Sequence, residues 1–359
     1  MAGGSGTRFW PLSRRNRPKQ FLAIGTEAPL IVETIERLAP LVPTDRIRIV
    51  AGAHHVDSIK ENLPALKSEA IVVEPCARNT APCIGLAAIH VAHHDPEAVM
   101  AVLPSDHHIG DGPQFRRLLQ AASERAQLGE IVTLGIKPTR PETGYGYIKL
   151  DGGVDRLESA AGIDVATVDR FVEKPDSDTA REYLDSGQFL WNSGMFFFTA
   201  RDILAAFERH LPELHSSLQR IASSIGTAEY DAVLEECFAA AQSISLDYGI
   251  MEPITQGEDP TPVRVIAADI GWNDVGHWAA LADFAPADEA GNVLTGDALV
   301  LDGHDNIVHS SNGLVALVGI SGAVVVRTDD AVLVCRREEA QDVRKIVAAL
   351  KAAKREELL

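Results

Sequence analysis

The sequence opens with the run Gly3-Gly4-Ser5-Gly6-Thr7-Arg8-Phe9-Trp10-Pro11-Leu12-Ser13, and Pro18-Lys19-Gln20-Phe21 follows shortly after it. Three glycines within four residues let the backbone adopt positive φ angles and approach a ligand closely, so that main-chain N–H groups can point at phosphate oxygens. Arg8 and Lys19 add two cations, the first a planar fork and the second a point charge. This stretch therefore predicts a loop that holds a triphosphate.

Spacing excludes the two better-known phosphate loops. A P-loop has Gly-Lys-Ser/Thr after its last glycine, whereas Thr7-Arg8 follows Gly6 here. The dinucleotide fingerprint needs a third glycine that opens a helix, and this run continues instead into Pro11 and the basic segment 14–18. A glycine-rich turn alone also suits a plain surface loop, but the arginine and the Pro-Lys pair favour phosphate binding.

The bulk composition limits the class of protein. The chain has 359 residues, 46% of them hydrophobic, and a net charge of −18. These values predict a large core, one large domain with a small one appended, and no nucleic-acid or acidic-membrane partner.

No apolar run reaches the roughly 20 residues of a membrane span and no signal-peptide layout is present, so we expect a cytoplasmic protein. The four cysteines lack CxxC spacing and are expected to be reduced thiols.

Residues 30–135 alternate between short apolar runs and amphipathic stretches, which is typical of βαβ units in a mainly parallel sheet. The expected strands are residues 46–51, 70–73, 99–103 and 131–135, and the expected helices are residues 30–39, 55–63, 80–94 and 114–128. Thr80 is expected to cap the third helix. Ligands of such open sheets bind at the carboxyl ends of the strands.

The sheet's first strand is not visible in this sequence. An open sheet of this type has a buried strand ahead of its glycine-rich loop, yet only Met1 and Ala2 precede the loop here. Either the real first strand begins upstream of Met1 or one sheet edge is left unpaired. We expect the former.

After residue 140 the pattern changes. Strands are expected at residues 145–150, 167–172 and 194–199, and a helical stretch at 201–241, which together suggest a lid built onto the sheet. Short apolar runs separated by tight turns then fill residues 292–335, and a terminal helix is expected from Glu338. This last segment is typical of a small β-meander or β-helical piece, whose expected role is packing or dimer contact.

Two aspartates follow apolar strands. Asp106 follows the expected strand 99–103, and Asp274 lies in a glycine-bounded turn after the expected strand 263–267. Two carboxylates together with phosphate oxygens and water suit octahedral Mg²⁺. Each aspartate alone could equally be a turn-capping residue.

Two further positions suit a sugar phosphate. In Glu173-Lys174 a carboxylate can accept hydrogen bonds from paired hydroxyls while the ammonium takes a phosphate, although a surface ion pair is the ordinary alternative. Asn192 sets an amide at the start of an aromatic strand, from which it can reach a ligand.

Taken together, these motifs resemble bacterial mannose-1-phosphate guanylyltransferases of the sugar-nucleotidyltransferase superfamily. The resemblance extends from Ala2 to about Trp278. The shared motifs are GGSGTR (3–8), WPLSR (10–14), PKQF (18–21), EPCARNTAP (74–82), LPSDH (103–107), GIKPTRPETGYGYI (135–148), FVEKPD (171–176), WNSGMF (191–196), SLDYGIME (245–252) and GWNDVG (271–276).

The resemblance implies an α/β fold: a Rossmann-like open mixed sheet flanked by helices, plus a small C-terminal β module with a terminal helix. It implies a catalytic domain over residues 1–285 and a β-helix-like module over 286–359. The implied reaction transfers GMP from GTP to mannose 1-phosphate with Mg²⁺ as cofactor, and a homodimer is expected.

The resemblance also implies roles for individual residues. The catalytic cations would be Arg8, on the leaving pyrophosphate, and Lys19, between the reacting phosphates. The nucleotide-binding residues would be Gly3, Gly4, Gly6, Thr7, Glu74, Arg78, Asn79 and Thr80. The sugar-phosphate pocket would hold Gly146, Glu173, Lys174 and Asn192, and Asp106 and Asp274 would bind the metal.

The sequence departs from the family in places. Pro253 stands where relatives usually carry lysine, and His277 where serine is frequent, which weakens the prediction for the sugar-phosphate side. The cupin-like isomerase domain of longer members is missing, so no phosphomannose isomerase activity is expected. Two alternatives remain open: a nucleotidyltransferase for another hexose 1-phosphate, and a non-catalytic sensor of sugar nucleotides.

Overall fold

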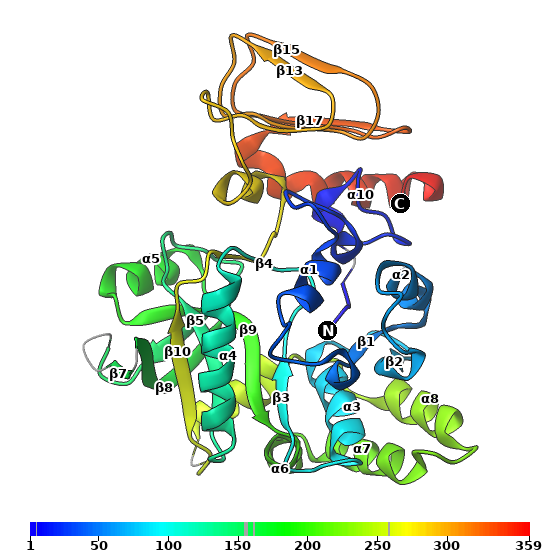
Figure 1. The fold of residues 1–359 in the computed structure, drawn as a ribbon, viewed down its shortest axis with the longest axis vertical. Coiled ribbons are helices and arrows are strands. Elements are labelled where there is room, and N and C mark those ends of the chain that lie inside the picture. Colours follow the sequence, from blue (N-terminus) through cyan, green and yellow to red (C-terminus); the bar gives the residue numbers. More distant parts are fainter. Residues whose placement is uncertain (5, 154–156, 161, 258) are drawn as a thin grey trace.

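The protein is described by a computed structural model that covers residues 1–4, 6–153, 157–160, 162–257 and 259–359. Ser5 of the glycine-rich run lies outside these ranges. Figure 1 shows a central sheet between helices, with the C-terminal β module at one end of the molecule and the N-terminal segment between the two. None of the helices in the described ranges has the length and apolar character of a membrane span.

In the described ranges the main sheet has seven strands. They are β3 (Val99–Val102), β5 (Ile131–Ile136), β6 (Gly146–Leu150), β7 (Glu158–Ala160), β8 (Ile163–Glu173), β9 (Phe189–Thr199) and β10 (Val263–Ala268). Their order is β10-β5-β9-β6-β8-β7, with β3 also paired to β9 and β10 to β8. Beside them β1 (Ile49–Gly52) and β2 (Ile71–Glu74) form a separate parallel pair.

Helices cover both faces of this sheet. They are α1 (Leu30–Glu36), α2 (Val56–Asn62), α3 (Thr80–Ala92), α4 (Gly112–Ala126), α5 (Ser177–Ser186), α6 (Ala200–His210), α7 (Pro212–Ser224), α8 (Tyr230–Ala240) and α9 (Glu252–Gln256). One core lies between the sheet and α3, α6, α7 and α8, and a second lies between the sheet and α4 with α1 and α2. The fold class predicted from the sequence is confirmed.

One local expectation was incomplete and two were wrong. The strands expected within residues 30–135 include the parallel pair β1–β2, but in the main sheet β9 runs antiparallel to β3, β5 and β6, so the described sheet is mixed. The strands after residue 140 form no separate lid, since β6, β8 and β9 complete the same sheet. The N-cap of α3 is Asn79, whose side chain accepts the Thr80 N–H, while Thr80 itself is the first helical residue.

Met1 and Ala2 lie between β1 and the end of β3. The Ala2 N–H donates to Val50 O (2.9 Å), and the Ser105 N–H donates to Met1 O (3.1 Å). These two residues therefore join the β1–β2 pair to the main sheet with strand-like hydrogen bonds at the point where the glycine-rich loop begins. The expected strand upstream of Met1 stays a prediction.

The C-terminal module is a coil of short strands with a helix beneath it. Its elements are β12 (Val293–Thr295), β13 (Ala298–Leu301), β14 (Ile307–Ser310), β15 (Val315–Val318), β16 (Ala323–Arg327), β17 (Val332–Arg336) and α10 (Val343–Ala352). The strands β12, β14 and β16 stack in parallel, as do β13 and β15.

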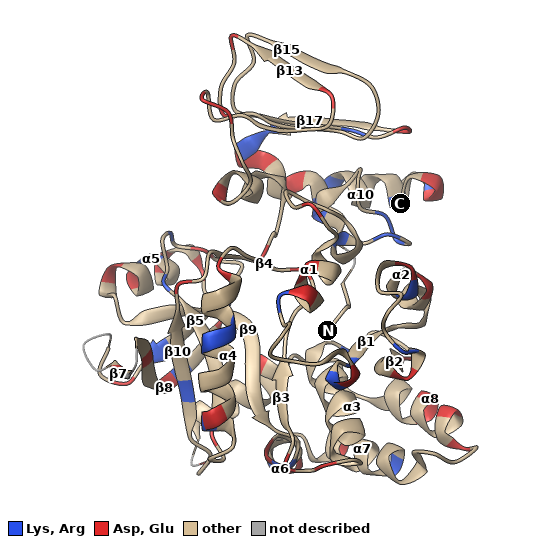
Figure 2. Cartoon of the chain, in the orientation of Figure 1, with Lys and Arg blue, Asp and Glu red and all other residues tan. Residues whose placement is uncertain are grey.

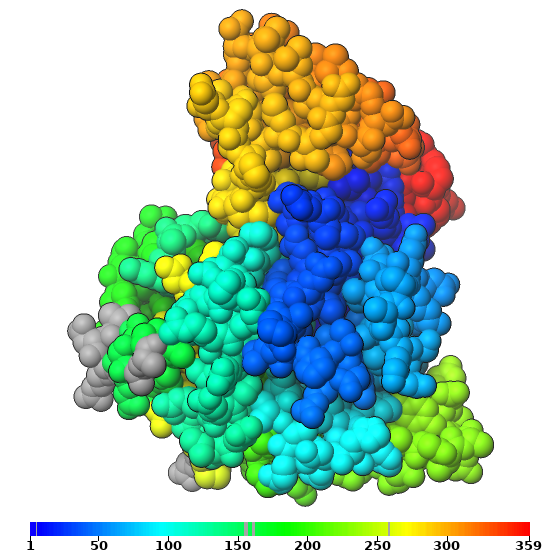
Figure 3. Space-filling view, viewed as in Figure 1, coloured from blue at the N-terminus to red at the C-terminus, as the bar shows by residue number. Residues whose placement is uncertain are grey.

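One apolar cluster joins Phe9 and Trp10 of the N-terminal segment to Val324 and Val347 of the module, so the module packs directly on the glycine-rich loop. In the space-filling view the N-terminal segment, coloured blue, lies against both the module and the rest of the molecule (Figure 3).

Candidate active site

The glycine-rich loop adopts a backbone that only glycine tolerates well. Gly4 and Gly6 have φ angles of 100° and 53°. A Cβ placed on Gly6 would lie 2.7 Å from both the backbone nitrogen and the Cβ of Lys19. The Ser13 hydroxyl donates to Gly6 O (2.7 Å) and fixes the turn. Glycine at this position therefore brings the loop into direct contact with Lys19.

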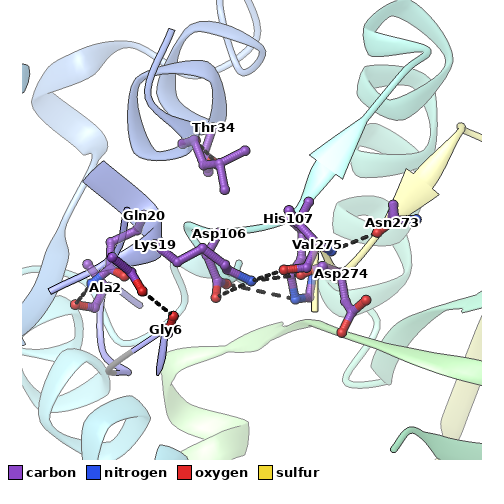
Figure 4. A network of polar contacts seen from close by, with 12 residues as sticks. Ala2, Gly6, Lys19, Gln20, Thr34, Asp106, His107, Asn273, Asp274 and Val275 are labelled. Atoms are coloured by element: carbon purple, nitrogen blue, oxygen red, sulfur yellow. Dashed lines mark hydrogen bonds and ion pairs between the residues drawn. The ribbon is translucent and has the colours of Figure 1, made fainter. Parts of the chain in front are cut away.

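Lys19 is the centre of the polar network drawn in Figure 4. Its ammonium donates to Asp274 O (2.7 Å) and Val275 O (3.1 Å) and forms an ion pair with Asp106 Oδ2 (2.9 Å). Only 10% of the Lys19 side chain is exposed. Because an ammonium has three donor hydrogens, all three are engaged here. Lys19 thus connects segments of the chain that are more than 250 residues apart.

Asp106 keeps its charge in this setting. Burial acts to raise the pKa of the Asp106 carboxyl, but the Lys19 ammonium outweighs it and holds that pKa below its ordinary value. The neighbouring His107 accepts a hydrogen bond at Nδ1 from the Trp272 indole (3.2 Å), so a neutral imidazole carries its proton on Nε2. That nitrogen lies 3.8 Å from Asp106 Oδ1.

Asp274 contributes to the network through its backbone. Its carboxylate turns away from Lys19 (Figure 4) and accepts a hydrogen bond from the Tyr145 hydroxyl (2.6 Å). Burial and the Asp274 charge raise the pKa of Tyr145, so this hydroxyl remains a donor. Tyr145 holds the carboxylate in place, a role that the sequence analysis missed although Tyr145 lies in one of the quoted motifs.

The carboxylates of Asp106 and Asp274 suit a hard cation that takes most of its ligands from the substrate and from water. No group of three or more His, Cys, Asp or Glu side chains with metal-binding geometry occurs in the described ranges. Asp106 and Asp274 offer carboxylate oxygens only, which agrees with the preference of Mg²⁺ for oxygen and for few protein ligands. The oxygen chemistry of the two residues fits Mg²⁺, and their binding of the ion together with phosphates stays a prediction.

Arg8 is exposed and, among the described residues, forms no ion pair. Burial lowers the pKa of His277, and the Arg8 charge acts in the same direction, which puts the guanidinium within electrostatic range of that imidazole. Asp274 acts on the same imidazole in the opposite direction. Arg8 is therefore an unpaired cation near the Lys19 network.

Strand pairing assembles the predicted sugar-phosphate residues. Gly146 on β6 pairs with Glu173 on β8, and a Cβ on Gly146 would lie 2.5 Å from Glu173 Oε2 and 3.3 Å from Asn192 Cβ. The Lys174 ammonium forms an ion pair with Glu173 Oε1. All four residues predicted for this pocket thus lie together, and only glycine fits at position 146.

Asp247 joins this group without having been predicted. It accepts a hydrogen bond from Asn192 Nδ2 (2.6 Å) at Oδ1, while Asn192 Oδ1 accepts the Gly194 N–H (3.0 Å). Burial, together with the charge of Glu173, raises the pKa of Asp247 to about 6. The quoted motif 245–252 contained Asp247, but only the fold reveals that it faces Asn192.

Glu74 lies at the carboxyl end of β2 and is buried. Its Oε1 has no hydrogen-bond partner among the described residues, and burial raises its pKa to about 7. A cavity of about 360 Å³ is lined by Glu74 together with Gly3, Gly4 and Thr7. Four of the eight predicted nucleotide-binding residues therefore share one cavity.

The structure does not bring Arg78, Asn79 and Thr80 to this cavity. The Arg78 guanidinium donates to the carbonyls of Phe238 (3.1 Å) and Ala239 at the end of α8. Thr80 Oγ1 accepts the Leu246 N–H (2.9 Å) and Asn79 caps α3. Their polar groups hold α3 and α8 together, and their contact with a nucleotide stays a prediction.

Comparison with known proteins identifies two matching family models. The nucleotidyl transferase model matches residues 1–291, and a model described as a MannoseP isomerase/GMP-like beta-helix domain matches residues 296–350.

Individual relatives match over nearly the whole chain. The xanthan biosynthesis protein XanB of Xanthomonas campestris is 41% identical over 99% of this chain and 73% of its own length. A mannose-1-phosphate guanylyltransferase of Klebsiella pneumoniae is 39% identical over 99% of this chain and 74% of its own. A crystal structure from Thermus thermophilus, titled a mannose-1-phosphate geranyltransferase, superposes with a TM-score of 0.86 at 36% identity and covers 98% of both chains.

Proposed function

The chain belongs to the nucleotidyl transferase family, and from this premise we propose that it transfers GMP from GTP to mannose 1-phosphate, giving GDP-mannose and pyrophosphate. Relatives that carry the name mannose-1-phosphate guanylyltransferase match it over 99% of its length. The observation that carries the proposal is the convergence of Lys19 on Asp106 and on the Asp274 backbone, directly behind Gly6.

The reaction needs no general base. The phosphate of mannose 1-phosphate is already an oxyanion at neutral pH; one of its oxygens forms a bond to the α-phosphorus of GTP. The bond from that phosphorus to the bridging oxygen breaks, and pyrophosphate leaves with the electron pair. Two anions repel each other, so the protein contributes positioning and charge neutralisation.

Lys19 and Arg8 supply the protein's share of that neutralisation. Because all three donor hydrogens of Lys19 are engaged, nucleotide binding exchanges its ion pair with Asp106 for a phosphate oxygen. This exchange frees the Asp106 carboxylate. Asp106 and Asp274 would then hold Mg²⁺, which would offset the charge of the phosphates. Arg8, exposed and unpaired among the described residues, holds the departing pyrophosphate.

The sugar phosphate lies on the β6–β8–β9 side of the network. Glu173 and Asn192 bind its hydroxyls and Lys174 its phosphate, above the backbone of Gly146. Asp247 orients the Asn192 amide by accepting its Nδ2 hydrogen bond (2.6 Å). Pro253 lies at the start of α9, directly after the π-helical segment Asp247–Met251.

The opposite side holds the nucleotide. Gly3, Gly4, Gly6 and Thr7 present backbone N–H groups to its phosphates, and Glu74 faces its base from the shared cavity. We place the boundary between the catalytic domain and the C-terminal module at residues 285 and 286, and we propose that the chain forms a homodimer.

The test is pyrophosphate release with each of the four common ribonucleoside triphosphates, paired with mannose 1-phosphate or glucose 1-phosphate, with and without Mg²⁺. We expect turnover with GTP and mannose 1-phosphate in the presence of Mg²⁺. Preference for a different sugar phosphate would establish the alternative hexose specificity. Ligand binding without turnover in any combination would establish the sensor alternative and contradict the proposal.

A further inference from the structure

The C-terminal module supplies one wall of the cavity behind the glycine-rich loop. The cavity, about 360 Å³, is lined by Gly3, Gly4 and Glu74 and also by Val347, Lys351 and Leu359 of the module. Its volume is within the range of small-molecule sites. Nothing in the sequence of the module indicated such a contact, because the motifs end near Trp278.

Specific contacts hold α10 and the following residues against the loop. The Trp10 indole donates to Leu358 O (2.8 Å), and the Arg14 guanidinium donates to the same oxygen (3.1 Å) and pairs with Asp330 (2.8 Å). Val347 is buried in the same apolar cluster as Trp10. Helix α10 therefore belongs to the same hydrophobic cluster as the glycine-rich loop.

The polar groups of the cavity are complementary to a guanine nucleotide. Glu74 lines the cavity and is 8% exposed, and its enclosed Oε1 lacks a partner among the described residues, so the cavity wall contains an unpaired carboxylate oxygen. The rim arginines are already occupied, since Arg14 pairs with Asp330 and Arg15 lies 3.7 Å from Glu356. Lys351 forms no ion pair in the described part of the chain. Guanine presents N–H donors on one edge and the acceptors O6 and N7 on another.

We propose that α10 is part of the nucleotide site and that Lys351 determines GTP affinity, its ammonium meeting acceptor atoms of the guanosine end while Glu74 accepts from the base. This inference rests on the proposed function and extends the site beyond residue 285. It assigns to the module a role in binding GTP as well as in packing.

The test compares Lys351→Ala and Lys351→Glu with Lys345→Ala. Lys345 lies on the same helix, pairs with Asp342 (2.7 Å), and is 71% exposed, which makes it a matched control. Loss of a charge-assisted hydrogen bond corresponds to roughly a tenfold loss of affinity. We expect Lys351→Ala to weaken GTP binding about three- to tenfold, as measured by calorimetry, and Lys351→Glu to weaken it more.

Steady-state kinetics of the Lys351 variants show which substrate the substitution affects. KM for GTP should rise in parallel with Kd, whereas kcat, KM for mannose 1-phosphate and KM for pyrophosphate in the reverse reaction should stay within twofold of wild type. GTP affinity of Lys351→Glu equal to that of Lys345→Ala would overturn the inference. A rise in KM for pyrophosphate alone would also overturn it, because it would put Lys351 at the leaving group.

The two proposals fail separately. Wild-type protein that binds GTP but does not turn it over with mannose 1-phosphate would contradict the proposed function, while weaker GTP binding by Lys351→Glu would still support the α10 site. Normal turnover with unchanged GTP affinity in both Lys351 variants would contradict the α10 site alone. Melting temperatures of all variants check that the exposed substitutions leave the fold intact.

Discussion

Glu74 shows how a functional side chain is kept at a cost in stability. Burial raises its pKa to about 7, from an ordinary value of 4.5, and leaves Oε1 without a partner among the described residues. Between these two pH values the folded state binds more protons than the unfolded state, so the free energy of unfolding falls as pH rises. The penalty is fully present above pH 7, where the carboxylate is ionised and buried.

Replacing the Glu74 carboxyl with an amide should remove this pH-dependent penalty. Glu74→Gln should raise the free energy of unfolding relative to wild type at pH 8 by on the order of 3 kcal/mol, and the gain should vanish near pH 4.5. Urea unfolding without nucleotide at both pH values measures it. Glu69→Gln, at an exposed position nearby, is the control and should show no such pH dependence. A Glu74→Gln gain that is the same at both pH values would contradict the assignment.

The limits of prediction from sequence also appear at this scale. Lys19, Asp106, Glu173, Lys174 and Asn192 were predicted from the residue types in their motifs, and Gly146 from the family resemblance. The structure brings the four sugar-phosphate residues together, and their roles stay predictions. Arg78 was predicted for the nucleotide, yet its guanidinium bonds two carbonyls of α8. Asp247 and Tyr145 were missed as functional residues, because their roles depend on contacts with Asn192 and Asp274, which are distant in the sequence.

At the scale of elements, the glycine-rich loop depends on one close approach. Gly6 has a φ of 53° and lies against the Lys19 backbone. Gly187, which ends α5, has a φ of 63° but open space around it. Alanine substitutions at Gly6 and Gly187 therefore separate the cost of backbone strain from the effect of displacing Lys19.

We predict that Gly6→Ala lowers both stability and turnover. Strain and the clash together should cost about 1–3 kcal/mol of unfolding free energy, and turnover should fall at least tenfold because Lys19 is displaced. Gly187→Ala should cost about 1 kcal/mol and leave turnover unchanged. Equal turnover in the two variants would show that the contact with Lys19 does not matter for catalysis.

Element prediction succeeded where local pattern decides structure. The apolar runs at residues 131–135 and 263–267 predicted β5 and β10 to within one residue. The strands β4 (His108–Ile109) and β11 (Trp272–Asn273) were missed, because each is two residues long and forms only by pairing with the other. The antiparallel pairing of β9 with β3, β5 and β6 was not predicted, because long-range pairing leaves no local signal in the sequence.

At the scale of the whole molecule, charged residues are distributed unevenly over the elements. Asp and Glu residues are distributed over outer helices such as α5 and α8, whereas β13 and β15 carry no charged residue (Figure 2). The C-terminal module instead exposes large apolar side chains. These are Leu294, Leu299, Leu301, Leu314, Val318, Ile320, Val332, Val334 and Ile346.

This apolar surface supports the prediction of a homodimer. Monomers seldom leave so many large apolar side chains exposed in one small module. We expect light scattering to give twice the chain mass for wild type and a single chain mass for the double variant Val318→Lys, Val334→Lys. Gln219→Lys, on the exposed face of α7, is the control for added charge. A wild-type mass equal to one chain at micromolar concentration would contradict the prediction.

The central claim is that an acidic chain assembles a local cationic centre in which two anions react, and Lys19 is the residue on which it depends. The most direct measurement is kcat for pyrophosphate release by Lys19→Ala at saturating GTP, mannose 1-phosphate and Mg²⁺. Lys149→Ala, which removes a surface ion pair with Asp169, is the control. We predict a fall of about 10²–10³ for Lys19→Ala, with a circular dichroism spectrum like that of wild type. A rate close to wild type in a folded Lys19→Ala protein would contradict the account.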